Sequence, residues 1–315
     1  MKLFVTGASG YIGSVVLEHA VQAGHTVEGL ARNQESAAKV ARLGATPVAG
    51  DLHSLDVLTA AASRADAVLH LAYIHDFALD HSIVINTEVK AVAALAKGSQ
   101  GKPLITTSGT AFVTPSPDGG ETDETAPINE SFVLTQRAHA ERAALDLAKL
   151  GVHVVAVRLP QYVYGRGGSF FAPLLMQQAA KHGVSAWIEG ATKRTSDVDV
   201  DDVARFYLAA LKSASGGSVY ICTGETHVTT RQLAEAVGQA VDVPARGMSR
   251  AEVEKLWGPF LAAFVDYDNR ASSAKAQREL GWKPHAKLGL LADITEGSYF
   301  ELAKQLREQR QSSVK

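Results

Sequence analysis

The sequence predicts an α/β fold in which helices cover both faces of a doubly wound parallel β-sheet. Over the first half of the 315-residue chain, short apolar runs rich in β-branched residues alternate with longer stretches of helical periodicity. These runs are apolar throughout, which is typical of strands buried between two layers of helices. Ligands of such sheets bind beyond the carboxyl ends of the strands, so we expect the functional site at that edge.

The alternation of strands and helices continues to about residue 158. The predicted strands are Leu3–Thr6, Thr26–Leu30, Thr46–Val48, Ala67–Leu71, Pro103–Thr107 and His153–Arg158. The helices predicted between them are Ile12–Ala23, Ser36–Leu43, one that begins at Ser54, Ser82–Lys97 and Phe132–Leu150. Each predicted strand is thus followed by a segment long enough to cross back over the sheet, as parallel pairing requires.

The pattern changes at the glycine cluster Gly165–Gly168. Helices and loops dominate from there, with two later strands predicted near Ser196–Val200 and Ser218–Thr223. We therefore expect a Rossmann-type cofactor domain made of residues 1–167 and 197–223. A smaller, mostly helical substrate-binding region should comprise residues 168–196 and 224–315.

Charge and cysteine content argue against several classes of partner. The chain has 31 basic and 33 acidic residues, and no run of five like charges, so neither nucleic acid nor a membrane surface is an expected partner. Its single cysteine, Cys222, lies in an apolar stretch, which excludes a disulfide framework and fits a reducing compartment. With no stretch of eighteen apolar residues and a short apolar N-terminal run, we expect a cytoplasmic protein that takes a small-molecule substrate.

A glycine motif follows the first predicted strand. Residues 6–13 read T-G-A-S-G-Y-I-G, so Gly7, Gly10 and Gly13 lie between a strand and a helix. Gly7 permits the tight turn, Gly10 lets the backbone approach a pyrophosphate, and Gly13 lets the helix pack closely. Amides at the helix N-terminus then face the phosphates. The motif predicts a dinucleotide site, and we expect Thr6, Tyr11 and Ile12 to contribute to it.

The end of the second predicted strand indicates which dinucleotide is bound. NAD-binding proteins place an acidic residue there to hold the ribose 2′-hydroxyl, whereas this chain has Ala31 followed by Arg32. An arginine suits a 2′-phosphate through charge-assisted, bidentate hydrogen bonds. We therefore predict NADP(H), the alternative being that Arg32 is a solvated surface residue.

Further motifs make the chain resemble the extended short-chain dehydrogenase/reductase superfamily, which includes nucleotide-sugar epimerases and dehydratases. The motifs are G-D-L at 50–52, V-L-H-L-A at 68–72, Asn86, T-T-S-G at 106–109, A-E at 140–141, R-L-P-Q-Y-V-Y-G at 158–165, V-D-V-D-D-V-A at 198–204 and L-G-W-K-P at 280–284. The resemblance covers nearly the whole chain. It implies further cofactor contacts at Asp51, Leu52, Leu71, Ala72, and at Pro160 to Val163; it implies no metal site.

The resemblance also implies a catalytic Ser or Thr after the fifth strand and a Tyr-x-x-x-Lys pair on the next helix. Ser108 can fill the first place, with Thr110 as a competitor. Counting back from Ala140-Glu141, the tyrosine position falls on Val133 and the lysine position on Arg137. Valine has no proton to give, and arginine cannot act as an acid at neutral pH. The chain therefore resembles an atypical subgroup without the usual pair, in which Arg137 could still bind the ribose.

Several side chains could replace the missing tyrosine. Tyr73, His75 and Asp76 follow the fourth strand; His75 beside a carboxylate could titrate near neutrality, or the pair could simply order its loop. Tyr162 and Tyr164 follow the sixth strand, where Tyr164 suits packing, and we expect Tyr73 and Tyr162 to contact the substrate. We expect His139 to face solvent or a subunit contact, and Arg194 to bind substrate phosphate or pair with Asp197 or Asp199.

Three functions remain open from the sequence. The first is NAD(P)H-dependent reduction of a small apolar carbonyl or activated alkene, with Ser108 holding the oxygen and His75, a tyrosine or water giving the proton. The second is a non-catalytic NADP(H) sensor, and the third a nucleotide-sugar epimerase or dehydratase. Aromatic residues that could line an apolar pocket are Trp187, Trp257, Phe260, Phe264 and Tyr267. The long helices Ser82–Lys97 and Phe132–Leu150 commonly pair in relatives, which implies a homodimer.

Overall fold

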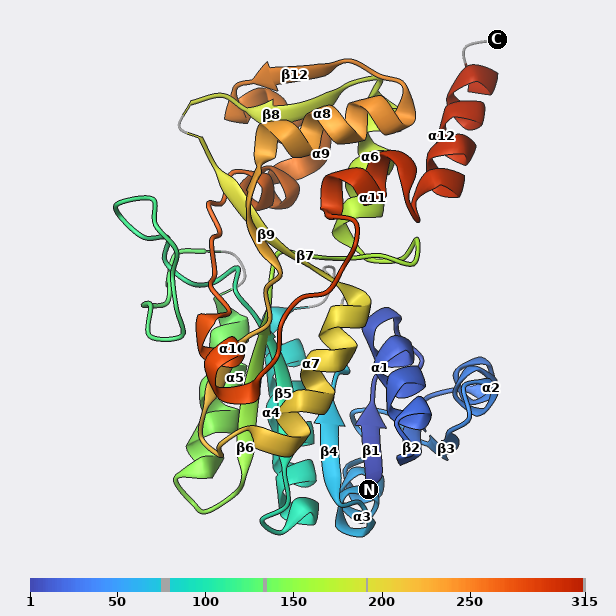
Figure 1. Ribbon diagram of the computed structural model, residues 1–315, viewed down its shortest axis with the longest axis vertical. Coiled ribbons are helices and arrows are strands. Elements are labelled where there is room, and N and C mark those ends of the chain that lie inside the picture. The colour runs from blue at the N-terminus through green and yellow to red at the C-terminus, as the bar shows by residue number, and fades with distance from the viewer. Residues whose placement is uncertain (75–79, 133–134, 191, 314–315) are drawn as a thin grey trace.

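The computed structural model describes residues 1–74, 80–132, 135–190 and 192–313. Its largest element is a sheet of seven strands in the order β10-β6-β5-β4-β1-β2-β3, and every neighbouring pair in it is parallel. The predicted Rossmann-type α/β fold is therefore confirmed (Figure 1). The strands are β1 (Lys2–Thr6), β2 (Thr26–Ala31), β3 (Thr46–Ala49), β4 (Ala67–His70), β5 (Leu104–Gly109), β6 (Val154–Leu159) and β10 (Val219–Ile221).

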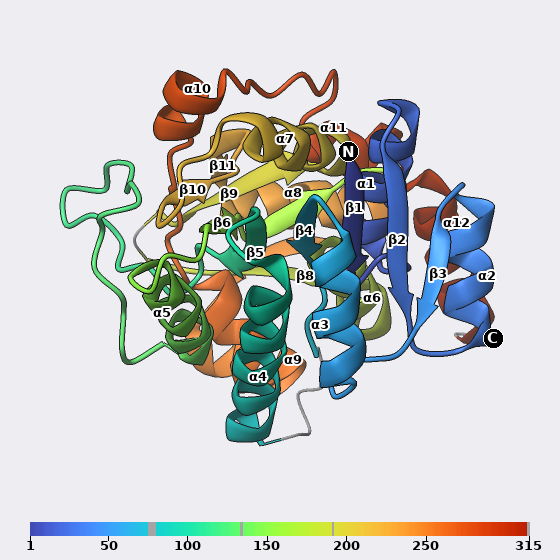
Figure 2. The same cartoon turned by 90° about the horizontal axis from the view of Figure 1, so that it is seen from below.

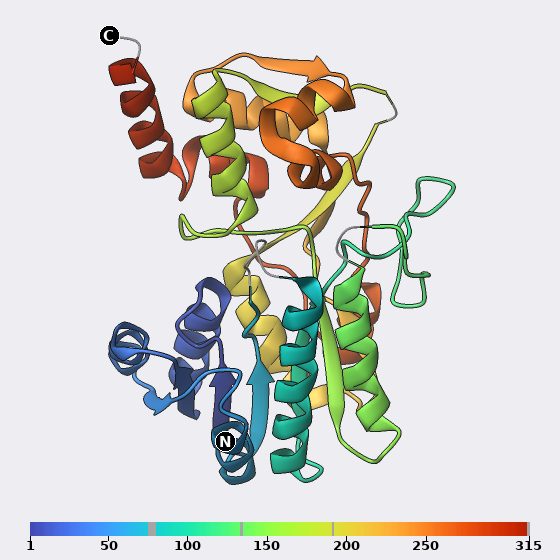
Figure 3. The same cartoon turned by 180° about the vertical axis from the view of Figure 1, so that it is seen from behind.

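Helices cover both faces of this sheet. On one face α3 (Leu55–Arg64) packs on α4 (His81–Ser99), which packs on α5 (Gln136–Ala148); on the other, α1 (Tyr11–Gln22) packs on α7 (Val200–Ser213). Helix α2 (Gln34–Arg42) packs on β2 and β3 at the sheet's edge. Figures 2 and 3 show these layers from below and from behind. The central strands β1, β4 and β6 are largely apolar, as expected of strands with both faces covered.

The central strands form the core of the fold. All four residues of β4 and all six of β6 are buried, and Val154, Val155 and Val157 are 0% exposed. Burying one such side chain contributes about 1.5–3 kcal/mol relative to leaving it in water. The core therefore fixes the carboxyl ends of β1, β4 and β5, which is the edge where the glycine motif lies.

A second region lies above that edge (Figure 1). Its three-stranded sheet consists of β7 (Tyr162–Tyr164), β9 (Arg194–Asp199) and β11 (Glu225–Thr229), and its two-stranded sheet of β8 (Ser185–Ile188) and β12 (Ala245–Met248). The helices of this region are α6 (Phe171–His182), α8 (Thr230–Val241), α9 (Arg250–Val265), α11 (Leu290–Glu296) and α12 (Phe300–Ser313). The region is rich in helix, as expected, but it also contains short strands that the sequence did not predict.

One late segment returns to the large sheet. Helix α10 (Ala274–Leu280) packs against α7 and β10, and the Trp282 ring is buried in the same core. The indole of Trp282 donates a hydrogen bond of 3.0 Å to the Asp202 carbonyl. The fully buried Asp202 carboxylate accepts from the backbone amides of His285 and Ala286. These contacts fasten the chain between α10 and α11 to the cofactor half of the molecule. No helix among the described residues is long and apolar enough to cross a membrane.

Candidate active site at the carboxyl edge of the sheet

The glycine motif forms a tight turn between β1 and α1. Gly7 has a φ of +69°, a conformation that favours glycine, and accepts a hydrogen bond of 2.9 Å from the Gly10 amide. A Cβ on Gly13 would lie only 2.0 Å from the Gly7 carbonyl oxygen, so helix and turn pack closely. The α1 N-terminus has no side-chain cap and no acidic residue in its first turn. Its amides can therefore take an anion such as a pyrophosphate.

The segment after β4 lies directly against this turn. A Cβ on Gly7 would lie 2.7 Å from the Ala72 nitrogen and 2.8 Å from the Leu71 carbonyl carbon. The Ala72 amide also donates to the Thr6 hydroxyl, over 3.3 Å. The two stretches expected to contact the cofactor are thus held together, and the geometry of the turn fits a dinucleotide.

A buried polar network that the sequence did not indicate supports this contact. His70, at the end of β4, lies 2.7 Å from the Thr6 hydroxyl through Nδ1 and 3.0 Å from Glu88 through Nε2. All three side chains are buried. A neutral His70 with its proton on Nε2 satisfies every partner, because Thr6 then donates to Nδ1 and Nε2 donates to the carboxylate. The network ties the glycine turn to α4.

Two cations flank the end of the site where an adenosine would lie. Arg32 directly follows β2, is exposed, and makes no hydrogen bond or ion pair with another described residue. Lys39 extends from α2 and donates a hydrogen bond of 2.9 Å to the carbonyl of Ser9 in the glycine turn. Lys39 and Ser9 lie 30 positions apart in the sequence, and no local motif indicates that they are in contact.

The G-D-L motif follows β3 on the same edge. Asp51 accepts hydrogen bonds from the His53 amide and the Ser54 hydroxyl, and these interactions hold the pKa of its carboxyl below the ordinary value. The Leu52 side chain is buried. It borders a cavity of about 420 Å³ between the start of α3 and α4, which Ile83 and Asn86 also line.

Ser108 and Thr110, which the sequence left in competition, differ in their partners. The Thr110 hydroxyl donates a hydrogen bond of 2.9 Å to Asn269, whose side-chain amide donates in turn to the Thr110 carbonyl. The Ser108 hydroxyl is buried and has no hydrogen-bond partner among the described residues. It lines a cavity of about 10 Å³, roughly the size of one water molecule. Ser108 is therefore available to a ligand, whereas Thr110 is engaged in structure.

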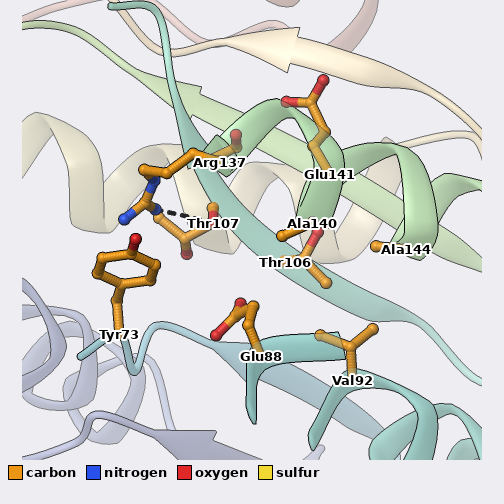
Figure 4. Close-up of a pocket in the computed structure, with 10 residues that line it drawn as sticks. Tyr73, Glu88, Val92, Thr106, Thr107, Arg137, Ala140, Glu141 and Ala144 are labelled. Atoms are coloured by element: carbon orange, nitrogen blue, oxygen red, sulfur yellow. Dashed lines mark hydrogen bonds between the residues drawn. The ribbon is translucent and has the colours of Figure 1, made fainter. Parts of the chain in front are cut away.

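Arg137 and Tyr73 line the same cavity (Figure 4). Arg137 lies in the first turn of α5 and donates a hydrogen bond of 3.3 Å to the Thr107 carbonyl. Its guanidinium carbon lies 3.8 Å from the centroid of the Tyr73 ring, which places the cation over the ring face. Val133, His75 and Asp76, which the sequence singled out, lie outside the described residues.

The tyrosines near β7 and the glycine turn are held in structural contacts. Tyr11 donates a hydrogen bond of 2.8 Å to the Gly165 carbonyl, and burial raises the pKa of its phenol. Tyr164 donates to the Leu288 carbonyl over 2.7 Å. Tyr162 is buried in the core of the second region, with its ring edge against Phe264. Tyr162 thus takes part in packing at its place in the structure, while the neighbouring Val163 is half-buried and Pro160 is buried.

Two charged residues near β9 differ from expectation. Of the two alternatives for Arg194, the ion pair with Asp197 or Asp199 is absent from the described part of the chain, and the contact with a substrate phosphate stays a prediction. Asp199 instead caps α7 by accepting from the amides of Asp201 and Asp202. Asp197 is buried, neither of its carboxylate oxygens has a described partner, and burial raises its pKa to about 8. His139 is exposed, as expected, near Glu130.

The five C-terminal aromatic residues do not form one cluster. Phe260 and Phe264 stack with Phe171 of α6, with ring centroids 6.4 and 3.8 Å from it. Trp187 lies beneath the guanidinium of Arg231. Tyr267 stacks on Phe132 with a centroid distance of 4.1 Å, and Trp257 has a buried indole nitrogen without a described hydrogen-bond partner. The rings of Phe171, Phe260 and Phe264 therefore pack together between α6 and α9, at the core of the second region.

Comparisons with known proteins agree with this geometry. The model of the NAD dependent epimerase/dehydratase family matches residues 3–222. An uncharacterized protein of Schizosaccharomyces pombe is 35% identical over 303 residues, which cover 95% of this chain and 100% of that protein. A 4-hydroxy-2-methyl-3-oxo-4-farnesyl-3,4-dihydroquinoline-1-oxide ketoreductase of Stigmatella aurantiaca is 29% identical, with 74% and 71% covered. The crystal structure of UDP-glucose 4-epimerase from Thermus thermophilus, in complex with NAD, superposes with a TM-score of 0.74 at 21% identity, covering 96% of this chain and 99% of that one.

Proposed function

The chain belongs to the NAD-dependent epimerase/dehydratase family, and from this premise we propose that it is an NADP(H)-dependent reductase of a small, apolar carbonyl compound or activated alkene. The observation that carries the proposal is the buried, unpartnered Ser108 hydroxyl beside Arg137, at the sheet edge that also holds the glycine turn. Bound NADPH would supply the hydride for this chemistry.

The residues on either side of the glycine turn support the cofactor part of the proposal. The α1 amides would hold the pyrophosphate, and Leu71 and Ala72 would border the ribose that follows it. The 2′-phosphate would be bound by Arg32, with the Lys39 ammonium at the mouth of the same turn. A cation at Arg32 and no carboxylate directly after β2 favour NADPH over NADH.

The chain's own groups would then act on the substrate oxygen. The Ser108 hydroxyl is free to donate a hydrogen bond to a carbonyl oxygen, and hydrogen bonds in a water-poor site stabilise the charge that develops there. Arg137, fixed by the Thr107 carbonyl, supplies a cation next to the reacting groups. Hydride transfer depends mainly on positioning and on stabilising the oxyanion, so the lack of a tyrosine at position 133 lowers the expected rate without preventing turnover.

The surface above the sheet edge supports an apolar substrate. Phe171, Phe260 and Phe264 form stacked pairs, and Phe170, next to them, is 43% exposed. Such rings favour hydrophobic ligands over a sugar nucleotide. The similarity to a ketoreductase of a farnesylated quinoline oxide points in the same direction.

A turnover assay tests the proposed function. The protein is incubated with NADPH and a panel of aldehydes, ketones, quinones and activated alkenes, and the loss of nicotinamide absorbance is followed. We expect turnover of at least one apolar panel member, and a loss of roughly 10²–10³-fold in kcat for Ser108→Ala, because one oxyanion-stabilising donor is removed. The matched control is Ser63→Ala, since Ser63 is exposed on α3 and its hydroxyl donates to the Ala60 carbonyl of the same helix. NADPH binding without turnover of any member would favour the sensor function instead.

We also propose that the protein is a homodimer that pairs through α4 and α5. These helices lie side by side on one face of the sheet, as Figure 3 shows, and Ile83 at the start of α4 is 52% exposed. Light scattering would measure the mass in solution. A mass of twice 33.3 kDa is expected, and a monomeric mass would contradict the proposal.

A further inference from the structure

We propose that Tyr73 is the proton donor of the reaction, in place of the tyrosine that position 133 lacks. This inference rests on the proposed reductase function. It follows from an arrangement that no motif indicated: a phenol, a cation and a free serine hydroxyl, brought by three different elements, line one small cavity. The three residues are Tyr73 after β4, Ser108 on β5 and Arg137 on α5.

The backbone that carries Tyr73 is fixed in place. Strands β4 and β5 pair in parallel with His70 opposite Thr106, so the residues beyond them emerge at the same edge. Leu71 and Ala72 lie against Gly7, and the Ala72 amide is bonded to Thr6. Tyr73 therefore begins from a positioned backbone on the side of the sheet where ligands bind.

Arg137 orients the Tyr73 side chain. Its guanidinium lies 3.8 Å from the ring centroid and is itself held by the Thr107 carbonyl, next to Ser108. Figure 4 shows the hydroxyl end of Tyr73 directed toward Arg137. The phenol, the cation and Ser108 thus line the cavity in which a substrate oxygen bound to Ser108 would lie. A cation at this distance also counters the negative charge that the ring acquires when its proton leaves.

None of the other described tyrosines near this edge lines the cavity that Ser108 and Arg137 share. Tyr207 is fully buried, and its hydroxyl pairs with the Thr107 hydroxyl over 2.7 Å. Those held elsewhere are Tyr11 at Gly165, Tyr164 at Leu288 and Tyr162 in the core of the second region. Tyr73 is half-buried and, of the tyrosines among the described residues, it is the one that lines the cavity with Ser108.

The proton step balances with the groups named. With the hydride that bound NADPH would supply forming the new C–H bond, the electron pair of the C=O π bond would move to the oxygen. The O–H bond of Tyr73 breaks, its electron pair stays on the phenol oxygen, and the proton forms the new O–H bond of the alcohol. Solvent then returns a proton to Tyr73. Arg137 acts through Tyr73 and is a positioning residue in this step.

Tyr73→Phe tests the inference, because it keeps the ring beneath Arg137 and removes only the hydroxyl. Turnover is measured with the panel member that the wild type reduces, NADPH affinity by calorimetry, and the unfolding midpoint by thermal denaturation. We expect kcat to fall by roughly 10²–10⁴-fold, the usual contribution of a general acid, with KM, cofactor affinity and midpoint unchanged. Tyr220→Phe is the matched control, since that hydroxyl bonds Glu279 at the far side of the sheet.

Each other outcome overturns the inference. An unchanged kcat in Tyr73→Phe would show that the proton comes from another group, while the reductase function would stand. A loss of kcat that is matched by equal weakening of NADPH binding or of stability would make Tyr73 a binding or packing residue. Absence of turnover by the wild type would contradict the reductase function and the donor together.

Discussion

At the scale of single residues, Asp197 is a buried carboxyl group whose oxygens have no partner among the described residues. It is 1% exposed and lies on β9. Burial raises its pKa from 3.8 to about 8, and nearby Glu225 adds to the shift. The folded protein therefore keeps this side chain protonated at a pH at which the unfolded chain has released the proton.

The stability of the protein should depend on pH through Asp197. Between the two pKa values the folded state holds one more proton than the unfolded state. The stability that the protonated Asp197 gives the folded state is therefore complete below pH 3.8 and is lost as the pH rises to about 8. The loss is at most about 1.4 kcal/mol per pH unit. We predict that Asp197→Asn raises the unfolding midpoint above that of the wild type, and that the gap widens from pH 5 to pH 8.

Thermal unfolding across this pH range measures the effect. Asp146→Asn is the control, because Asp146 is exposed and pairs only with Lys149. A gap between Asp197→Asn and wild type that stays constant with pH would contradict the raised pKa.

Arg32 and Lys39 should decide the choice of cofactor. Charge-assisted hydrogen bonds to a phosphate contribute about 1.5–3 kcal/mol, so we predict that Arg32→Ala weakens NADPH binding by roughly tenfold to a hundredfold and leaves NADH binding unchanged. Lys39→Ala should weaken NADPH binding by less, because its ammonium also bonds Ser9. Calorimetric titration with both cofactors gives these affinities.

Arg42→Ala supplies the control for Arg32→Ala, since Arg42 is the last residue of α2 and lies at the end of the helix away from Arg32. Equal affinity of the wild type for NADPH and NADH, unaffected by Arg32→Ala, would contradict the assignment of Arg32 to the 2′-phosphate.

Residue by residue, local motifs predicted the cofactor turn but not the partners of single side chains. The sequence placed Ser108 and Thr110 in competition because both have hydroxyls near the end of β5. What separates them is Asn269, which lies 159 residues beyond Thr110 and binds its hydroxyl. The stacking of Arg137 on Tyr73 likewise joins two elements 64 positions apart, and no local pattern indicates it.

At the scale of elements, α5 is fastened to β6 by a buried ion pair. The Arg158 guanidinium bonds the Glu141 carboxylate at 2.7 and 3.0 Å, and both side chains are less than 10% exposed. Arg158 also donates to the Glu124 carbonyl. The A-E motif of the sequence thus anchors the helix that positions Arg137.

Removing one partner of this pair should be costly. Glu141→Ala leaves the buried Arg158 charge without its carboxylate, so we predict a loss of about 3–5 kcal/mol in the free energy of unfolding. Denaturant unfolding measures it, and Lys149→Ala, which removes half of an exposed pair, should change the value by less than about 0.5 kcal/mol. A cost as small as that of the control would mean that Arg158 finds other partners.

Among the elements, strands between two helical layers were the easiest to predict. Every strand expected in the first 158 residues is present, because continuous apolar runs have few alternatives once both faces are buried. Strands β8 and β12 have only four residues each and pair with one another far apart in sequence, so their local signal is weak. Helix α5 begins at Gln136, four residues later than expected, after a turn in which Thr135 bonds the Asn129 carbonyl.

At the scale of the whole molecule, the chain crosses between its two halves more than once. Strands β7 and β9 lead into the second region, and α10 with Trp282 returns to the core of the large sheet. Hydrophobic periodicity marks α10 as a helix but carries no information on which core it joins. The large sheet and its carboxyl edge follow from the sequence, whereas the position of the second region above that edge depends on these long-range contacts.

The proposed reaction of this site is the transfer of a hydride from NADP(H) to an apolar carbonyl or alkene. Reduction with NADPH that carries deuterium at the transferable position of the nicotinamide, followed by mass spectrometry of the product, tests it most directly. We predict that the product carries one deuterium on the carbon that was reduced. In Ser108→Ala, the incorporation of deuterium should be absent or much slower. Tight NADPH binding with no deuterium in any product would contradict hydride transfer at this site.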